Sequence, residues 1–139
     1  PPRPVAPPLR PPRRADAPVA GPDAVALVTD AMAAAGMADG AYELGPMRVT
    51  VAHGVARLTD GGAIAGGTYH LLDVVRETVE AGVPLVDAVR AASWTPAGVL
   101  GLDDRGGLVA GLRADVVVTD GDLRVREVLR GGEGVDLSA

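Results

Sequence analysis

The sequence predicts an α/β fold, and three observations along the chain support this. An apolar run from Ala24 to Val28 is typical of a strand that is apolar on both faces, as strands of parallel sheets are. Residues 69–101 repeat apolar positions at helical spacing, and the chain from Gly106 onward consists of short apolar runs separated by Gly and Asp. Together they predict a strand, then helices, then a group of strands.

Composition limits the function classes. The 139 residues are 47% hydrophobic and carry a net charge of −5, which is typical of a globular chain that does not bind nucleic acid. No apolar run approaches the roughly 20 residues of a membrane span. The chain has no Cys and its start lacks the apolar core of a secretory signal, so a cytoplasmic location without membrane contact is expected.

Residues 1–22 differ from the rest, because nine of the 12 prolines and four arginines lie there. Such a segment cannot form a helix or a central strand and is expected to be disordered or extended. The chain lacks Lys, Asn, Gln, Phe and Cys, a bias typical of GC-rich coding DNA, which favours an out-of-frame or misassigned start. A basic nucleic-acid-binding arm and a transit peptide are the alternatives.

The next elements are a hairpin and a helix. Met47 to Leu58 is rich in β-branched residues and has a central His53-Gly54 pair, which predicts a hairpin turn. Thr68 is expected to cap a helix over 69–81 that ends at Gly82. Its apolar face is formed by Leu72, Val75 and Val79.

A second helix is expected to begin after Pro84, and a short third one runs from Thr95-Pro96 to Gly101. Trp94, the only Trp, is interpreted as a packing residue. The predicted buried face of the second helix consists of Leu85, Ala88, Val89 and Ala92.

Strands are predicted at 108–109, 114–119 and 125–129. The acidic residues beside them, Asp115, Asp120 and Asp122, are interpreted as turn and edge residues without a catalytic role.

The first apolar run is closed by Thr29 and Asp30, and Asp30 is the candidate catalytic residue. Catalytic groups gather at the C-terminal ends of strands in parallel α/β barrels. An Asp after a strand is also a common helix cap or turn former, because its side chain accepts local backbone hydrogen bonds. Both interpretations are open from the residues alone.

Four stretches carry a family resemblance: LVTDAMAAAGMADGAYELG, VTVAHGVARLTDGGAIAGG, RAASWTPAGVLGL and GGLVAGLRADVVVTD. Between about Gly21 and Val135 the chain resembles the N-acetylglucosamine-6-phosphate deacetylases of the amidohydrolase superfamily. The resemblance implies a C-terminal fragment of a (β/α)8 barrel over 23–104, with the last strand, helices and a hairpin insertion. It implies part of a small β-sandwich domain over 105–139.

The same resemblance implies site residues. Asp30 matches the family's catalytic aspartate, which acts first as base and then as acid, and Ile64-Ala65-Gly66 match a loop that contacts the sugar phosphate. Where the family often has Ser, this chain has Gly67. The implied reaction hydrolyses the acetamide of N-acetylglucosamine 6-phosphate to glucosamine 6-phosphate and acetate.

The family implies a divalent metal, zinc or similar, bound through residues on earlier strands, and an intact enzyme that is a homo-oligomer. His53 and His70 are the only histidines and form no metal-binding spacing, so both are interpreted as structural or solvent-facing. No metal ligand is assigned in this chain. A lone strand with unpaired edges would also make the chain self-associate or depend on a partner.

Two alternatives accompany this interpretation. One is another amidohydrolase, similar to a dihydroorotase or cyclic-imide hydrolase, which shares the aspartate and the terminal strands. The other is a non-catalytic remnant or interaction module.

Overall fold

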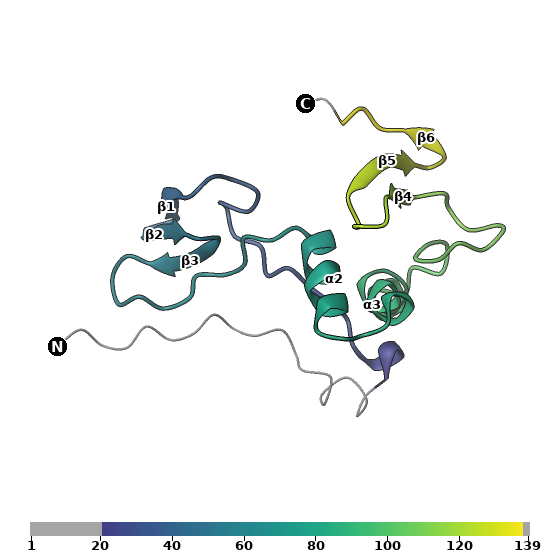
Figure 1. Ribbon diagram of the computed structural model, residues 1–139, viewed down its shortest axis with the longest axis horizontal. Helices are drawn as coiled ribbons and strands as arrows, with labels where there is room; N and C mark the ends of the chain where they lie inside the picture. The colour runs from purple at the N-terminus through teal and green to yellow at the C-terminus, as the bar shows by residue number, and fades with distance from the viewer. Residues whose placement is uncertain (1–20, 138–139) are drawn as a thin grey trace.

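A computed structural model describes residues 21–137 of the chain (Figure 1). The predicted Pro/Arg-rich segment 1–22 therefore lies outside the described residues, except for its last two positions. One three-stranded sheet, a group of helices and a second three-stranded sheet follow one another along the chain. The first sheet lies on the left of Figure 1, the helices lie to its right, and the yellow C-terminal strands lie above the helices.

The first sheet is an antiparallel meander that contains the predicted hairpin. Its strands are β1 (Gly40–Leu44), β2 (Met47–Ala52) and β3 (Val55–Leu58). Ala52 pairs with Val55, and the two residues between them, His53 and Gly54, have φ of 52° and 71°. Positive φ at both central residues is the requirement of a type I′ hairpin turn. The predicted hairpin is confirmed, and β1 extends it by a strand that the sequence had not indicated.

The buried core is formed by residues of this sheet and of the segment before it. Val49 and Val51 alternate with exposed neighbours along β2, and both are buried, as is Ala56 of β3. Met32 and Ala34, from the segment that precedes β1, complete the cluster. The larger side chains that pack around its margin are Tyr42, Leu44 and Leu58.

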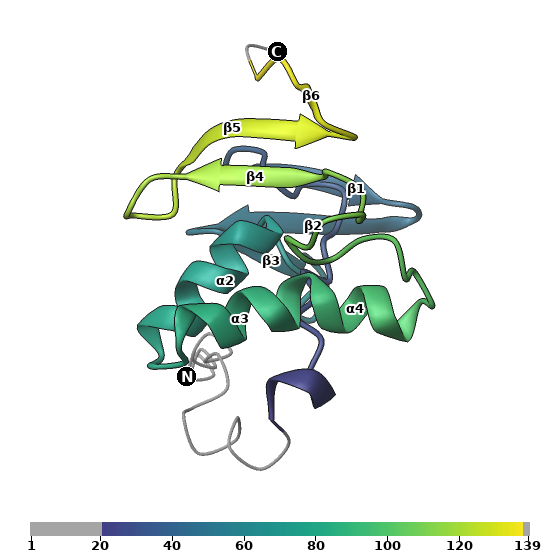
Figure 2. The same ribbon diagram turned by 90° about the vertical axis from the view of Figure 1, so that its right-hand side faces the viewer.

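The helices are α2 (Leu71–Glu80), α3 (Leu85–Ala92) and α4 (Trp94–Val99), and Figure 2 shows α3 and α4 running nearly end to end. Helix α2 begins two residues later than predicted, because the Thr68 hydroxyl donates to the carbonyl of Gly54 and does not cap it. The Asp73 carboxylate instead accepts the backbone N–H of His70 at 2.9 Å. The end of the helix agrees with the prediction, since Gly82 follows it with a φ of 96°.

The helices contact each other mainly through small side chains. Ala88 and Ala91 of α3 are buried, together with Val75 of α2. The prediction that Leu85 and Val89 lie on the buried face is wrong, since they are 44% and 45% exposed. Helix α3 contacts both α2 and α4, and Ala88 and Ala91 are its buried residues.

The predicted strand over 24–28 is also not formed among the described residues. Pro22–Ala24 is a short 3-10 helix, η1, and the following residues are extended but make no ladder. Val28 is 72% exposed instead of buried. A strand needs a hydrogen-bonded neighbouring strand, whereas the Leu27 N–H donates to the carbonyl of Ala91 at the end of helix α3, at 2.8 Å.

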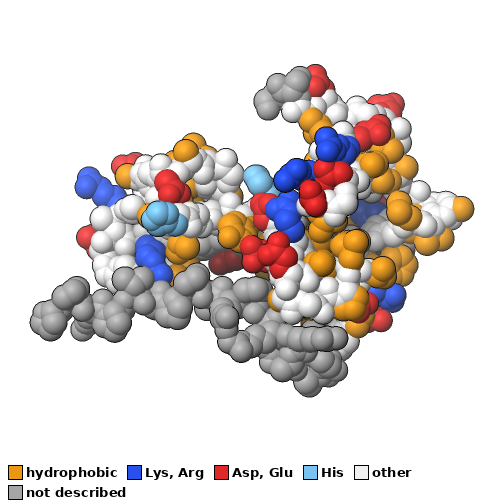
Figure 3. Space-filling view, viewed as in Figure 1, with side chains coloured by type: hydrophobic (Ala, Val, Ile, Leu, Met, Phe, Trp, Pro, Cys, Tyr) orange, Lys and Arg blue, Asp and Glu red, His pale blue; other side chains and the backbone are white. Residues whose placement is uncertain are grey.

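The C-terminal sheet consists of β4 (Val116–Thr119), β5 (Val125–Arg130) and β6 (Glu133–Gly134), in antiparallel order. The predicted strands 114–119 and 125–129 are thus confirmed with small shifts of their ends. The pair 108–109 forms no strand and lies in an exposed connection, where Leu108 is 85% exposed. Figure 3 shows many hydrophobic side chains, in orange, on the surface of the right-hand part of the molecule.

No helix within residues 21–137 has the length and apolar character needed to cross a membrane.

Candidate functional site

Asp30 stands out among the carboxylates of the described chain by its backbone conformation. It is exposed, and its φ of 48° places it in the left-handed region. Within residues 21–137 its carboxylate takes part in no hydrogen bond or ion pair. Non-glycine residues in this conformation concentrate at functional sites, and Asp tolerates it better than most residues do.

Within residues 21–137 the Asp30 side chain accepts no backbone hydrogen bond, so it does not act as a local cap. The hydroxyl oxygen of Thr29 instead accepts the backbone N–H of Ala31, at 3.3 Å. The Asp30 carboxylate is therefore free to interact with a ligand.

The loop after β3 lies directly against the backbone of Asp30. The N–H of Gly67 donates to the carbonyl of Asp30 at 2.6 Å, and the N–H of Met32 donates to the carbonyl of Gly67 at 2.9 Å. These two bonds form the parallel bridge around Ala31. Residues 37 positions apart in the sequence are thereby joined.

Ile64 and Ala65, predicted from the family resemblance to contact substrate, are joined to β3. The N–H of Ala65 donates to the carbonyl of Ala56 at 3.0 Å, and Ile64 forms a bridge with Arg57. Ala65 packs at the margin of the core, whereas Ile64 is 42% exposed. The fold thus brings the two predicted parts of the site, Asp30 and the 64–66 loop, to the same place.

Asp39 holds the hairpin turn next to this loop, a role that the sequence analysis did not identify. Its carboxylate accepts the backbone N–H of His53 at 2.6 Å and of Gly54 at 3.2 Å. These donors, His53 first, keep the pKa of Asp39 below its usual value. Asp39 and His53 are 14 residues apart in the sequence, so no local sequence pattern predicts this hydrogen bond.

Neither histidine joins a metal-binding cluster. His53 is exposed in the hairpin turn, and the ring of His70 lies against Gly36 before α2. Across the described part of the chain, no group of three or more His, Asp or Glu side chains is placed to hold a metal ion. The described residues by themselves therefore do not fit a metal centre.

Trp94, interpreted as a packing residue, is only partly covered. Its ring lies against the backbone of Gly107, where an added Cβ would be 3.0 Å from ring atoms. The residue is otherwise 45% exposed, and it begins α4.

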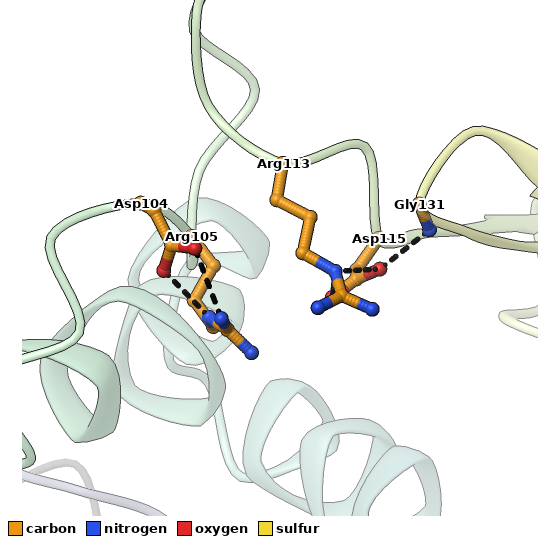
Figure 4. A network of polar contacts seen from close by, with 5 residues as sticks. All are labelled: Asp104, Arg105, Arg113, Asp115 and Gly131. Carbon is orange, nitrogen blue, oxygen red and sulfur yellow. Dashed lines mark hydrogen bonds and ion pairs between the residues drawn. The ribbon is translucent and has the colours of Figure 1, made fainter.

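The acidic residues of the C-terminal region are engaged in turns. Figure 4 shows the Arg113 side chain donating to Asp115 at 2.9 Å, while Asp115 also accepts the N–H of Gly131 at 2.7 Å. The Gly131 bond, more than Arg113, lowers the pKa of Asp115. Beside them Asp104 pairs with Arg105, which lowers the pKa of Asp104.

Asp120 and Asp122 have similar roles. Asp120 accepts the backbone N–H of Arg124 at 2.9 Å and of Asp122 at 3.0 Å, and the Arg124 bond is the main cause of its lowered pKa. Asp122 lies 3.7 Å from the Arg124 guanidinium. The interpretation of these carboxylates as turn and edge residues is confirmed.

Known proteins resemble the chain in sequence and in structure. A putative N-acetylgalactosamine-6-phosphate deacetylase of Escherichia coli K12 is 43% identical over 106 residues, covering 75% of this chain and 63% of that protein. The N-acetylglucosamine-6-phosphate deacetylase of Vibrio furnissii is 39% identical over 103 residues, covering 73% of this chain and 26% of its own length.

Among solved structures, an aspartate-to-alanine variant of N-acetyl-D-glucosamine-6-phosphate deacetylase from Mycobacterium smegmatis, in complex with N-acetyl-D-glucosamine-6-phosphate, superposes with a TM-score of 0.81. It is 46% identical, and the match covers 87% of this chain and 33% of that one. The chain has the fold of a part of these proteins and spans less than two thirds of the length of each.

The amidohydrolase family pattern matches residues 24–135, which include Asp30, the 64–67 loop, the helices and β4–β6. The chain therefore belongs to the amidohydrolase family.

Proposed function

We propose that this chain forms the C-terminal catalytic part of a deacetylase acting on N-acetylhexosamine 6-phosphates, with Asp30 as the proton-transfer residue. The observation that carries the proposal is the exposed Asp30 carboxylate, free of partners within residues 21–137 and held next to the 64–67 loop. Similarity to deacetylases of both N-acetylglucosamine 6-phosphate and N-acetylgalactosamine 6-phosphate supports the substrate class.

Hydrolysis of an acetamide needs two proton transfers. A base removes a proton from the attacking water, and an acid delivers one to the departing amine. One carboxylate can perform both transfers in sequence if the water and the amine lie on the same side of it. Asp30 leaves the first step protonated and the second step ionised, ready for another cycle.

Members of this family generally depend on a divalent metal. Because the described residues contain no ligand set for one, we assign them only proton transfer and substrate contact. The metal ligands of a working enzyme would come from other residues.

The 64–66 loop is proposed to contact the sugar phosphate. Ile64 offers an exposed apolar side chain beside the site, and the missing side chain of Gly66 lets the loop pack closely on Asp30 and Met32. The loop is tied to both β3 and Asp30, so a sugar bound to it would lie near the carboxylate.

The finer architecture follows from the same proposal. Residues 24–28 form no strand ladder within the described chain, and we propose that they pair with neighbouring strands as the last strand of a (β/α)8 barrel. The β4–β6 sheet would be part of a small β-sandwich. A homo-oligomeric enzyme located in the cytoplasm agrees with these assignments.

A graft tests the proposed function. The matching third of the Mycobacterium smegmatis deacetylase would be replaced by residues 24–135, and acetate release would be measured. The substrates are N-acetylglucosamine 6-phosphate, N-acetylgalactosamine 6-phosphate, unphosphorylated N-acetylglucosamine and a cyclic ureide.

We expect release from one or both sugar phosphates and little from the unphosphorylated sugar. Ring opening of the ureide alone would instead support another amidohydrolase. A folded graft inactive on every substrate would support a non-catalytic remnant or interaction module.

A further inference from the structure

Thr68 directly follows the 64–67 loop and joins it to two other segments of the chain. Its hydroxyl donates to the carbonyl of Gly54 in the β2–β3 turn. Its own carbonyl accepts the backbone N–H of Gly36, at 3.2 Å, from the segment that follows Asp30. The residue is half-buried. The end of the loop is therefore bonded both to the hairpin turn and to the segment that carries the candidate catalytic residue.

The hairpin turn offers a well-held point of attachment. The β2–β3 ladder closes it, and the Asp39 carboxylate accepts the backbone N–H groups of His53 and Gly54. The ring of Tyr69 lies at the same place, because a Cβ added to Gly54 would be 3.9 Å from a ring carbon. The N–H groups of the turn are thus bonded to Asp39, and the Gly54 carbonyl is bonded to Thr68.

The loop is attached along its whole length. At its start the N–H of Ala65 donates to the carbonyl of Ala56 in β3, at 3.0 Å, and near its end Gly67 is bonded to the carbonyl of Asp30. These two attachments use backbone groups, which nearly every residue type supplies. The attachment to the hairpin turn is different, because it needs the hydroxyl of Thr68.

We propose that Thr68 is a positioning residue, whose hydroxyl fastens the end of the 64–67 loop to the hairpin turn and so holds the loop in one position beside Asp30. The inference deepens the proposed function and rests on it. A loop that is already ordered loses less conformational entropy when a ligand binds to it. Loss of the hydroxyl should therefore weaken substrate binding more than it slows the chemical step.

Thr68→Val tests the inference, because it removes the hydroxyl and keeps a branched side chain of nearly the same shape. Thr68→Ser keeps the hydroxyl and is the conservative variant. Thr50→Val is the matched control, since the Thr50 hydroxyl lies on the exposed side of β2 and contacts only the Thr59 hydroxyl among the bonds described, at 3.2 Å. The first readout is amide hydrogen exchange in the full chain.

In Thr68→Val the amides of Gly36 and Gly67 should exchange about fivefold faster, the effect expected for the loss of one hydrogen bond. The amides of β2 should be unchanged, because the sheet keeps its ladder and its core. Exchange in Thr68→Ser and in Thr50→Val should match that of the unchanged chain at both glycines. Unchanged exchange at Gly36 and Gly67 in Thr68→Val would overturn the inference. So would an equal acceleration throughout β2, which indicates a general loss of stability.

If Thr68→Val does not fold, the unchanged chain decides. A Thr68 hydroxyl proton that gives its own NMR signal, because its bond to Gly54 slows exchange with water, would support the inference. A hydroxyl proton that exchanges too fast to be seen would overturn it.

The second readout is the kinetics of the graft. Thr68→Val should raise KM for the sugar phosphate about fivefold and change kcat by less than about twofold, because Asp30 itself is untouched. Thr68→Ser should restore KM. A lower kcat at unchanged KM would overturn the positioning role.

The two readouts separate the two proposals. An inactive graft whose Gly36 and Gly67 amides respond as expected in the full chain counts against the proposed function. An active graft, combined with no selective response of these amides, counts against the role of Thr68.

Discussion

The two sheets of this chain have the same number of strands and the same antiparallel order, but only one of them encloses a core. In the first sheet, Val49, Val51 and Ala56 are buried against Met32 and Ala34. In the β4–β6 sheet no residue is buried, and Val117 is 54% exposed.

The difference indicates where the candidate site gets its rigidity. Asp30 and the 64–67 loop are joined to the sheet that has the core, through Met32 and Ala65. The C-terminal sheet is held by turn hydrogen bonds and ion pairs, such as that of Asp115 with Arg113, which contribute little when exposed to solvent. A small apolar cluster thus supports the site, whereas the β4–β6 sheet has no packed face of its own among the described residues.

The largest expected effect on stability comes from Val49→Ala. Val49 is the largest fully buried side chain, and removing two methyl groups should cost about 2 kcal/mol of the free energy of unfolding. Val117→Ala is the matched control, because an exposed site should change stability by less than about 0.5 kcal/mol. Urea unfolding followed by circular dichroism measures both. Equal losses in the two variants would remove the distinction between the sheets.

Hydrogen exchange should sharpen the comparison without any substitution. Strands β2 and β5 are the central strands of their sheets, so each has neighbours on both sides. We expect the amides of β2 to exchange more slowly than those of β5, because buried apolar contacts oppose local opening. Slower exchange of the β5 amides than of the β2 amides would contradict the conclusion that the first sheet is the more stable of the two.

Acid should affect the two sheets differently. The pKa values of Asp39 and Asp120 are lowered by backbone N–H donors, His53 and Arg124 being the largest contributors. A lowered pKa in the folded state adds stability above the unfolded value, and this is lost as the pH falls through the folded value. Below the ordinary value of 3.8, both turns should therefore loosen.

The sheet with a core should tolerate this loss better. We expect amides of the β4–β5 turn to lose exchange protection at a higher pH than those of the β2–β3 turn. Asp39→Asn should remove the pH dependence at His53 and Gly54 alone. Earlier loosening of the β2–β3 turn would contradict the comparison.

The smallest expected effect on stability is that of Asp30→Asn. Asp30 is exposed and its carboxylate makes no hydrogen bond or ion pair within the described chain, so its charge stabilises nothing there. Asn also tolerates the left-handed conformation. An unchanged urea midpoint is expected, and a clear loss of stability would indicate a structural role for the carboxylate.

Local features of the fold were predictable from the sequence. The β2–β3 hairpin was identified because its signals lie within a few residues, including the His53-Gly54 turn. The helices were placed to within about two residues. The strand over 24–28 was not formed, because pairing depends on neighbours that an apolar run cannot reveal.

The candidate site was predictable only in its parts. Family resemblance pointed to Asp30 and to Ile64, Ala65 and Gly66 separately. Their juxtaposition comes from hydrogen bonds between segments more than 30 residues apart. The anchoring of the turn by Asp39 was missed for the same reason.

The most direct test of the account is acetate release by the graft with and without Asp30→Asn. A positioned general acid or base contributes about 10²- to 10⁴-fold to a rate, so the variant should lose activity in that range while its folding stays unchanged. Such a loss would establish Asp30 as the proton-transfer residue. Full activity of the Asp30→Asn graft would contradict the account.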